Sequence, residues 1–172
     1  VTGVQTCALP ISLGSQSMAG GVTGTDNDIE AVLFDVGGVI VRLDDIATLG
    51  PFNGHTQSQA IKDIWARCEI VRSHETGALS AEAFAGRMVE AYAMNCSPQD
   101  FLARFCAWPR EVLPGSEAML NDLDPKLQMA CLSNTCDIHW RTQVASADLA
   151  RLFQRQFLSY QPGLMQPDVE MY

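Results

Sequence analysis

The sequence has few basic residues: eleven Lys and Arg stand against twenty Asp and Glu, and the formal net charge is −9 at pH 7. Phosphate backbones and anionic lipid surfaces attract basic proteins, so this acidic chain is a poor candidate for binding nucleic acid or a membrane. Long hydrophobic runs are also missing. The longest nearly apolar stretch, residues 31–41, contains Asp35 and is far shorter than the roughly 20 residues that span a bilayer. We therefore expect a soluble protein.

Cysteine pairs and metal-binding clusters are missing as well. The six cysteines are dispersed without a Cys-x-x-Cys pair, and the three histidines do not lie near them at the spacing of a zinc site. Without a recognisable secretory signal, this pattern favours reduced thiols in a cytoplasmic protein. The cysteines are Cys7, Cys68, Cys96, Cys106, Cys131 and Cys136.

The chain is long enough for one domain, since 172 residues lie near the rough prior of about 150 residues per domain. Hydrophobic residues make up 47% of it, which is enough to build a core. Residues 1–11 resemble the translation of a widely used sequencing adapter. We therefore expect an adapter-derived and disordered leader over residues 1–29, and a natural start at Met18.

Three short hydrophobic runs predict strands. Residues 29–34 form a near-continuous run, which is typical of a central strand buried on both faces of a parallel sheet, and Gly37 and Gly38 then turn the chain. Residues 127–132 predict a second buried strand, and residues 153–159 a weaker third one. A turn over residues 161–163 follows, and Pro167 would begin a further helix.

A helical block separates the first strand from the second. Apolar residues recur at helical spacing from residue 60 to residue 71, and Ser80 and Ser97 are placed as N-caps of two further helices. Shorter helices are expected from Pro114-Gly115 to residue 123 and over residues 138–147. The order of elements predicts an α/β fold with a parallel sheet and an inserted helical cap. We expect the core at residues 30–43 and 113–172, and the cap at residues 44–112.

Polar side chains follow each predicted strand, at the edge of a parallel sheet where ligands bind. Asp35 beside two glycines suits a nucleophile or a metal ligand, although an Asp here can also simply cap the turn. Ser133 and Asn134 follow the second strand and suit a phosphate cradle, but equally a helix N-cap. The third strand leads to the segment around Gln166. His139 lies beside Trp140 and is more typical of a packing residue.

Taken together, residues 31–41, 131–140 and 163–172 resemble the three ordered motifs of the haloacid dehalogenase-like (HAD-like) hydrolase superfamily. The resemblance is to its phosphatase branch with a small helical cap, and it runs from about residue 30 to the end of the chain. It implies an incomplete Rossmann-like core. The acidic fourth motif of the family would lie beyond Tyr172, so we expect a chain truncated at the C-terminus and itself inactive.

The resemblance also implies the roles of the site residues. Asp35 would be the nucleophile, and it would bind Mg²⁺ together with the backbone carbonyl of Gly37. Ser133, Asn134 and Gln166 would bind the phosphoryl group of a small phosphorylated metabolite. A carboxylate nucleophile divides hydrolysis into two steps through an aspartyl-phosphate, while the cation and the oriented donors offset charge on the phosphoryl oxygens.

Two departures from the family pattern leave other functions open. Gly37 stands where the family has a second Asp that protonates the leaving group, and Gln166 stands where it has a Lys. An amide can donate a hydrogen bond but cannot neutralise charge. The alternatives are a catalytically degenerate protein that binds a phosphorylated ligand or partner, and a metal-free dehalogenase-type hydrolase in which Asp35 attacks carbon.

Overall fold

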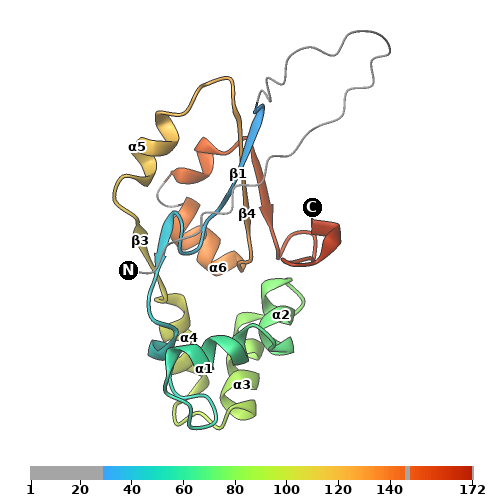
Figure 1. The fold of residues 1–172 in the computed structure, drawn as a ribbon. Helices are drawn as coiled ribbons and strands as arrows, with labels where there is room; N and C mark the ends of the chain where they lie inside the picture. The colour runs from blue at the N-terminus through green and yellow to red at the C-terminus, as the bar shows by residue number, and fades with distance from the viewer. Residues whose placement is uncertain (1–28, 146–147, 172) are drawn as a thin grey trace.

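A computed structural model describes residues 29–145 and 148–171. The expected leader lies outside these residues, apart from Ile29. Three parallel strands form a sheet in the order β1-β4-β5 (Figure 1). They are β1 (Ala31–Asp35), β4 (Gln128–Ser133) and β5 (Arg155–Leu158). The predicted α/β fold with a parallel sheet is therefore confirmed.

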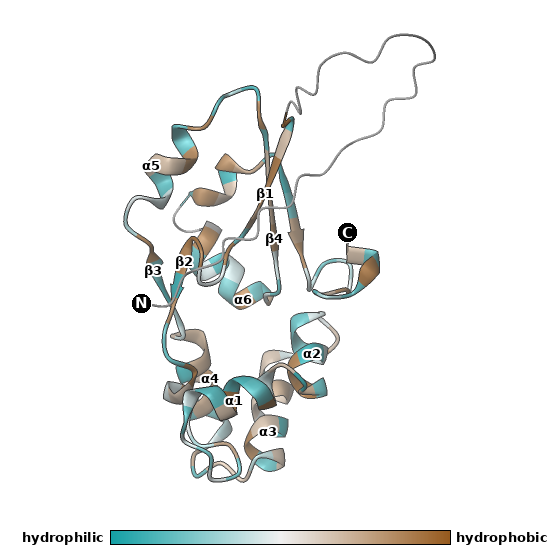
Figure 2. Cartoon of the chain, in the orientation of Figure 1, coloured by the Kyte–Doolittle hydropathy of each residue, from teal (hydrophilic) through white to brown (hydrophobic). Residues whose placement is uncertain are grey.

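The strand predicted at residues 29–34 is β1. Its hydrophobic run is drawn in brown over most of its length in Figure 2, but β1 lies at one end of the described sheet and its apolar side chains are only half-buried. The central strand is β4, in which Cys131, Leu132 and Ser133 are buried. The continuous apolar run therefore predicted the strand correctly, and in the described sheet this strand pairs with β4 alone.

The cap contains four helices: α1 (Ser58–Trp65), α2 (Glu69–Glu75), α3 (Ala81–Ala91) and α4 (Pro98–Cys106). The apolar residues expected to form one stripe from residue 60 to residue 71 belong to two helices. The chain leaves α1 because the N–H groups of Arg67 and Cys68 donate to carbonyls three residues back. Cys68 then takes an extended conformation as the N-cap of α2.

Both predicted serine caps are confirmed. Ser80 Oγ accepts from the Ala83 N–H at 3.3 Å. Ser97 and Asp100 form a reciprocal capping box: Ser97 Oγ accepts from the Asp100 N–H at 3.1 Å, and Asp100 accepts from the Ser97 N–H at 3.4 Å. These bonds satisfy N–H groups that the first turn of a helix leaves without partners.

An antiparallel ribbon that the sequence analysis did not predict connects the cap to the sheet. It pairs β2 (Val41–Leu43) with β3 (Pro109–Val112). Arg42 pairs with Glu111 at 2.8 Å across it, and Asp44 pairs with Arg110. These strands are too short for a period of two to appear in the sequence. The two segments that connect the cap to the sheet are thus held together by strand pairing and ion pairs.

The last predicted helices are shorter than expected. Helix α5 (Ser116–Asn121) follows Gly115, whose φ of 87° suits a glycine. Helix α6 (Asp137–His139) continues as a π-helical segment over Trp140–Ala145. The chain reaches β5 through a 3₁₀ helix, Leu149–Leu152. The helix expected from Pro167 is only a 3₁₀ turn, Val169–Met171.

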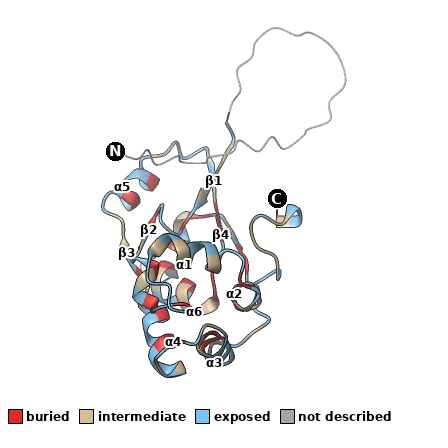
Figure 3. Ribbon diagram, turned by 60° about the horizontal axis from the view of Figure 1, so that its bottom comes forward, coloured by how far each residue is buried: buried red, intermediate tan, exposed pale blue. Residues whose placement is uncertain are grey.

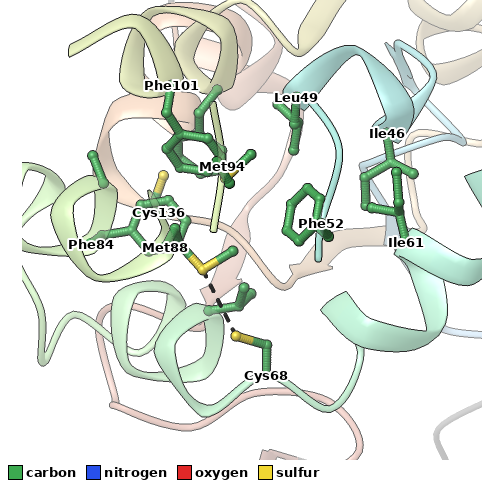
Figure 4. Close-up of a cluster of buried hydrophobic side chains, with 13 residues drawn as sticks. Ile46, Leu49, Phe52, Ile61, Cys68, Phe84, Met88, Met94, Phe101 and Cys136 are labelled. Atoms are coloured by element: carbon green, nitrogen blue, oxygen red, sulfur yellow. Dashed lines mark hydrogen bonds between the residues drawn. The ribbon is translucent and has the colours of Figure 1, made fainter. Parts of the chain in front are cut away.

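Two clusters of buried hydrophobic side chains hold the structure together. Figure 3 colours the ribbon by burial, and buried residues occur both in the cap helices and in the sheet. One lies among the cap helices and includes Phe84, Phe101 and Phe105, and Cys136 reaches it from the segment after β4. Figure 4 shows this cluster, with Cys68 Sγ 3.8 Å from Met88 Sδ. The other lies against the sheet. The five described cysteines are free, and no helix in the described ranges is long and apolar enough to cross a membrane.

Candidate functional site

The carboxyl ends of β1 and β4 lie side by side at the edge of the sheet that faces the cap helices (Figure 1). In the parallel register Asp35 stands opposite Leu132, so Ser133 is one position beyond it. The next pairing places Ser133 opposite Leu158 of β5. Asp35 and Ser133, which are 98 positions apart in the sequence numbering, therefore reach one edge because the strands are parallel.

A cavity of about 520 Å³ lies between this edge and the cap. Its wall combines backbone and side chains of the sheet loops with residues of α1, α2 and the segment between them. Asp35 is not part of the wall, but its neighbours Val36 and Gly37 are. The polar and aromatic lining residues include Ser133, Asn134, Gln166, His139, Trp65, Arg67, Arg72, Glu75 and Trp108.

Asp35 is exposed at the end of β1, and one carboxylate oxygen, Oδ1, accepts the Val36 N–H at 2.7 Å. Protein around the carboxylate partly desolvates it and raises its pKa, while the bond from Val36 lowers it. This bond is the one expected of an Asp that caps its turn. It uses one oxygen of the two, and the other accepts no hydrogen bond from the part of the chain that the structure describes.

The turn after Asp35 leaves the Gly37 carbonyl available. The Gly38 N–H donates to Val41 O at 2.8 Å, and the Val41 N–H donates to Val36 O at 3.0 Å. Gly38 adopts a φ of 79°, which explains a glycine there. Gly37 does not share this constraint: an added Cβ would lie 3.4 Å from Leu43 Cδ1, an ordinary contact.

Ser133 and Asn134 contribute to the site in different ways. Ser133 is 5% exposed and lines the cavity, and its hydroxyl makes no hydrogen bond to any residue that the structure describes. Asn134 instead holds the third segment: its Oδ1 accepts from the Gln166 N–H at 2.8 Å, and its Nδ2 donates to Gln166 O at 3.1 Å. The structure thus brings Ser133, Asn134 and Gln166 together, with Asn134 positioning the backbone of Gln166.

The donor set for a metal ion is small. Over residues 29–145 and 148–171, no three His, Cys, Asp or Glu side chains are grouped so that they could hold a metal. Asp35 and the Gly37 carbonyl supply one carboxylate and one neutral oxygen. Mg²⁺ commonly binds through one or two carboxylates together with substrate phosphate and waters. These residues therefore fit Mg²⁺ when phosphate and water complete its coordination.

His139 lines the cavity, but its ring is used in packing. The Nε2 atom lies 2.8 Å from Phe105 O, and the ring centroid is 4.2 Å from that of Phe105. Burial lowers the pKa of His139 to about 4, so the ring is neutral near pH 7. The prediction of a packing residue is confirmed.

Sequence reasoning missed the contribution of the cap. Arg67, Arg72 and Glu75 line the cavity from α2 and from the segment before it. Burial raises the pKa of Glu75 to about 7, although the neighbouring Trp65 opposes this shift. A carboxylate in the last turn of an amphipathic helix looks like a surface residue in the sequence. Only the docking of α2 against the sheet loops shows that Glu75 is partly buried.

Comparison of the sequence with protein-family models and with curated proteins finds no match. The structure, however, is similar to the HAD family enzyme BT-2542 from Bacteroides thetaiotaomicron, with a TM-score of 0.62 and 22% identity over 81% of this chain and 72% of that one. The complex of BT-2542 with magnesium and inorganic phosphate gives a TM-score of 0.57 at 22% identity, covering 81% of this chain and 73% of that one.

A second protein shows the same similarity. It is described as a predicted HAD-like family hydrolase from Porphyromonas gingivalis, and it has a TM-score of 0.56 and 18% identity over 81% of this chain and 70% of that one. At these identities the likeness is one of fold. The resemblance stated from the sequence motifs is therefore confirmed at that level: the chain has the α/β fold of the HAD family enzymes.

Proposed function

We propose that the protein is a phosphomonoester hydrolase of the HAD-like type, which acts on a small phosphorylated metabolite through an aspartyl-phosphate. The observation that carries this proposal is the placement of Asp35 and Ser133 at neighbouring strand ends, beside a cavity that the cap helices close. A structurally similar enzyme has been solved with magnesium and inorganic phosphate, which supports the choice of substrate class.

In this mechanism the free oxygen of Asp35 attacks phosphorus, and the ester oxygen leaves with the electron pair of the P–O bond. The Ser133 hydroxyl donates a hydrogen bond to a phosphoryl oxygen, and the polar groups around Gln166 bind another. Mg²⁺, when held by Asp35 and the Gly37 carbonyl, would offset negative charge on the phosphoryl group. Water then releases phosphate from Asp35 and restores the carboxylate.

The proposed division of the chain follows from the same arrangement. Residues 30–43 and 113–172 would form the core that carries out the chemistry, and residues 44–112 the cap that encloses the substrate. The two clusters of buried side chains, one among the cap helices and one against the sheet, support this division.

Asp35→Asn tests the function. The amide has the same shape but is a poor nucleophile and a poor Mg²⁺ ligand, so hydrolysis of an aryl phosphate should fall by at least about 10³-fold. The melting temperature should change little. Asp122→Asn is the matched control, because Asp122 is exposed at the end of α5, away from the cavity. Retention of most of the activity in Asp35→Asn would overturn the proposal. Turnover in the presence of a chelator would instead support the metal-free chemistry.

A second candidate function is phosphate binding without turnover. Gly37 and Gln166 supply neither a proton donor nor a cation, and the described residues form no acidic cluster. Calorimetric titration with inorganic phosphate, alongside the activity assay, separates the two functions. If the lack of a Lys side chain at position 166 limits turnover, Gln166→Lys should raise kcat/KM about 10-fold or more. Binding without turnover in both forms would favour the second candidate.

A further inference from the structure

Glu75 is the last residue of α2 and lines the same cavity wall as Gly37 and Ser133. The cap contributes two carboxylates to this wall, Glu69 and Glu75. The proposed reaction needs a proton for the departing ester oxygen, and Gly37 has no side chain to donate one. The position of Glu75 therefore meets a need that the residues at the strand ends leave unmet.

The end of α2 is fixed against the core by a buried hydroxyl. Ser159 Oγ lies 2.6 Å from the Glu75 carbonyl oxygen and 2.8 Å from Thr135 O, and it accepts the Thr135 N–H at 2.9 Å. Ser159 is fully buried. Two residues after Glu75, Gly77 approaches the core so closely that an added Cβ would lie 2.7 Å from Tyr160 O. Glu75 is thus held on the cavity wall by the core as well as by its own helix.

Trp65 of α1 lies beside the Glu75 carboxyl group and lowers its pKa, against the larger effect of burial. Arg72, one turn earlier on α2, is not its partner, because Arg72 pairs with Asp168 at 2.6 Å. The Trp65 ring is neutral, so it brings no counter-charge to the carboxyl group. A neutral carboxylic acid is compatible with these surroundings.

Titratable groups of the core and the cap lie near the end of α2 or on the cavity wall. The Cys136 thiol, after β4, has its pKa raised to about 11 by burial and, to a smaller extent, by Glu75 itself, so it is protonated near pH 7. His139 on α6 is neutral there. Tyr160, beside Ser159, has a raised pKa and is neutral as well. Arg67 and Glu69 lie on the cavity wall with opposite charges.

We propose that Glu75 is the proton donor to the leaving-group oxygen in the hydrolysis proposed above, on which this inference rests. As the P–O ester bond breaks, the electron pair goes to the ester oxygen, and the Glu75 carboxylic acid gives it the proton that completes the alcohol. The Glu75 carboxylate then takes a proton from the water that attacks the aspartyl-phosphate. The P–Oδ bond breaks, Asp35 recovers its electron pair, and phosphate leaves with the hydroxyl oxygen of that water.

The pKa of Glu75, raised to about 7 by burial, agrees with this assignment. A group with a pKa near the working pH is partly protonated before the first step and can accept a proton in the second. An ordinary exposed Glu is almost wholly ionised at that pH.

The test compares leaving groups in Glu75→Gln. For an alkyl phosphate, whose leaving oxygen needs a proton, kcat should fall by about 10²-fold or more. For a nitroaryl phosphate, whose leaving group departs as an anion, the fall should be less than about 10-fold. Glu90→Gln on α3 is the matched control, because it removes the same charge from an exposed position outside the cavity wall. Both substrates should be unaffected in the control.

The outcomes separate this inference from the function on which it rests. If the protein hydrolyses neither substrate, the proposed function fails and the inference fails with it. If hydrolysis depends on Asp35 while Glu75→Gln changes both substrates equally or neither, the inference alone is overturned. The NMR resonance of the Trp65 indole N–H gives a readout that needs no turnover. It should titrate with a midpoint near 7 in the unmodified protein, and a midpoint near 4.5 would also overturn the inference.

Discussion

Arg72 Nη2 lies 2.6 Å from Asp168 Oδ2, and this ion pair joins two residues that are 96 positions apart. Arg72 belongs to α2 of the cap, and Asp168 follows Pro167 in the segment that carries Gln166. The same oxygen of Asp168 accepts the Met165 N–H at 3.0 Å. The pair therefore connects the cap side of the cavity with the loop on its sheet side.

Breaking this pair should affect substrate binding more than stability. Both side chains are partly exposed, at 40% for Arg72 and 19% for Asp168, and ion pairs of this kind contribute little to folding. In Arg72→Met we expect KM to rise a few-fold, because α2 loses a contact that fixes it over the cavity, while kcat and the melting temperature change little. Steady-state kinetics and thermal unfolding measure the three quantities.

The partner variant Asp168→Asn supplies the control. If the two residues act through each other, the double variant should have a KM no higher than the worse single variant. Additive effects would show that each side chain acts alone. Arg72 also lowers the pKa of Asp168, so the pair persists at pH values above the ordinary Asp pKa and is lost as the pH falls through the lowered one.

Gly37→Asp should raise the turnover of alkyl phosphates by about 10-fold or more, because it places a carboxyl group two residues after Asp35. The backbone allows this change, since Gly37 does not have a positive φ and its Cβ would meet Leu43 at an ordinary distance. Combined with Glu75→Gln, the same substitution should restore part of the lost activity. Gly37→Asn is the matched control, having the size of Asp without its proton. Equal effects of Asp and Asn would contradict the prediction.

The sequence predicted those parts of the fold that depend on local patterns. The hydrophobic runs that became β1 and β4, and the serines at the starts of α3 and α4, carry their signals within a few residues. Asp35, Ser133 and Gln166 were predicted as candidate site residues because each lies at or after the end of a predicted strand, and parallel strands bring such residues to one edge.

The features that were missed depend on contacts between distant segments. The ribbon of β2 and β3 is held by pairs such as Arg42 with Glu111, which are 69 positions apart. The break between α1 and α2 does not interrupt the apolar spacing, so the stripe alone predicted one helix. Glu75 lies on the cavity wall because Ser159 of the core contacts its backbone carbonyl. No local pattern in the sequence predicts this contact.

The aromatic centre of the cap should dominate its stability. Phe105 is 1% exposed, and its ring centroid lies 4.9 Å from Phe84, 6.0 Å from Trp65 and 4.2 Å from His139. Phe105→Ala removes these contacts and leaves a cavity, which should cost about 3–5 kcal/mol of unfolding free energy. Phe157→Ala is the control, because Phe157 is 43% exposed on β5. Urea unfolding should show a far smaller loss there, and similar losses in the two variants would contradict the prediction.

The response of stability to pH should depend on two partly buried groups that act in opposite directions. His139 has a pKa lowered from 6.5 to about 4, so between these values the unfolded chain binds a proton that the folded chain does not. Its contribution falls as the pH drops, by as much as about 3 kcal/mol at pH 4. Glu75 has a pKa raised from 4.5 to about 7, so the folded chain holds the extra proton and its contribution rises as the pH drops.

Glu75→Gln separates these contributions. In the unmodified protein the two effects largely cancel between pH 5 and pH 6.5, so the unfolding free energy should change only slightly. In Glu75→Gln only the histidine effect remains, and the unfolding free energy should fall steadily as the pH is lowered over the same range. Urea unfolding at a series of pH values measures both slopes, with Glu90→Gln as the control that should follow the unmodified protein. Parallel curves for Glu75→Gln and the unmodified protein would show that Glu75 is ionised in the folded chain throughout this range, as an ordinary surface carboxylate would be.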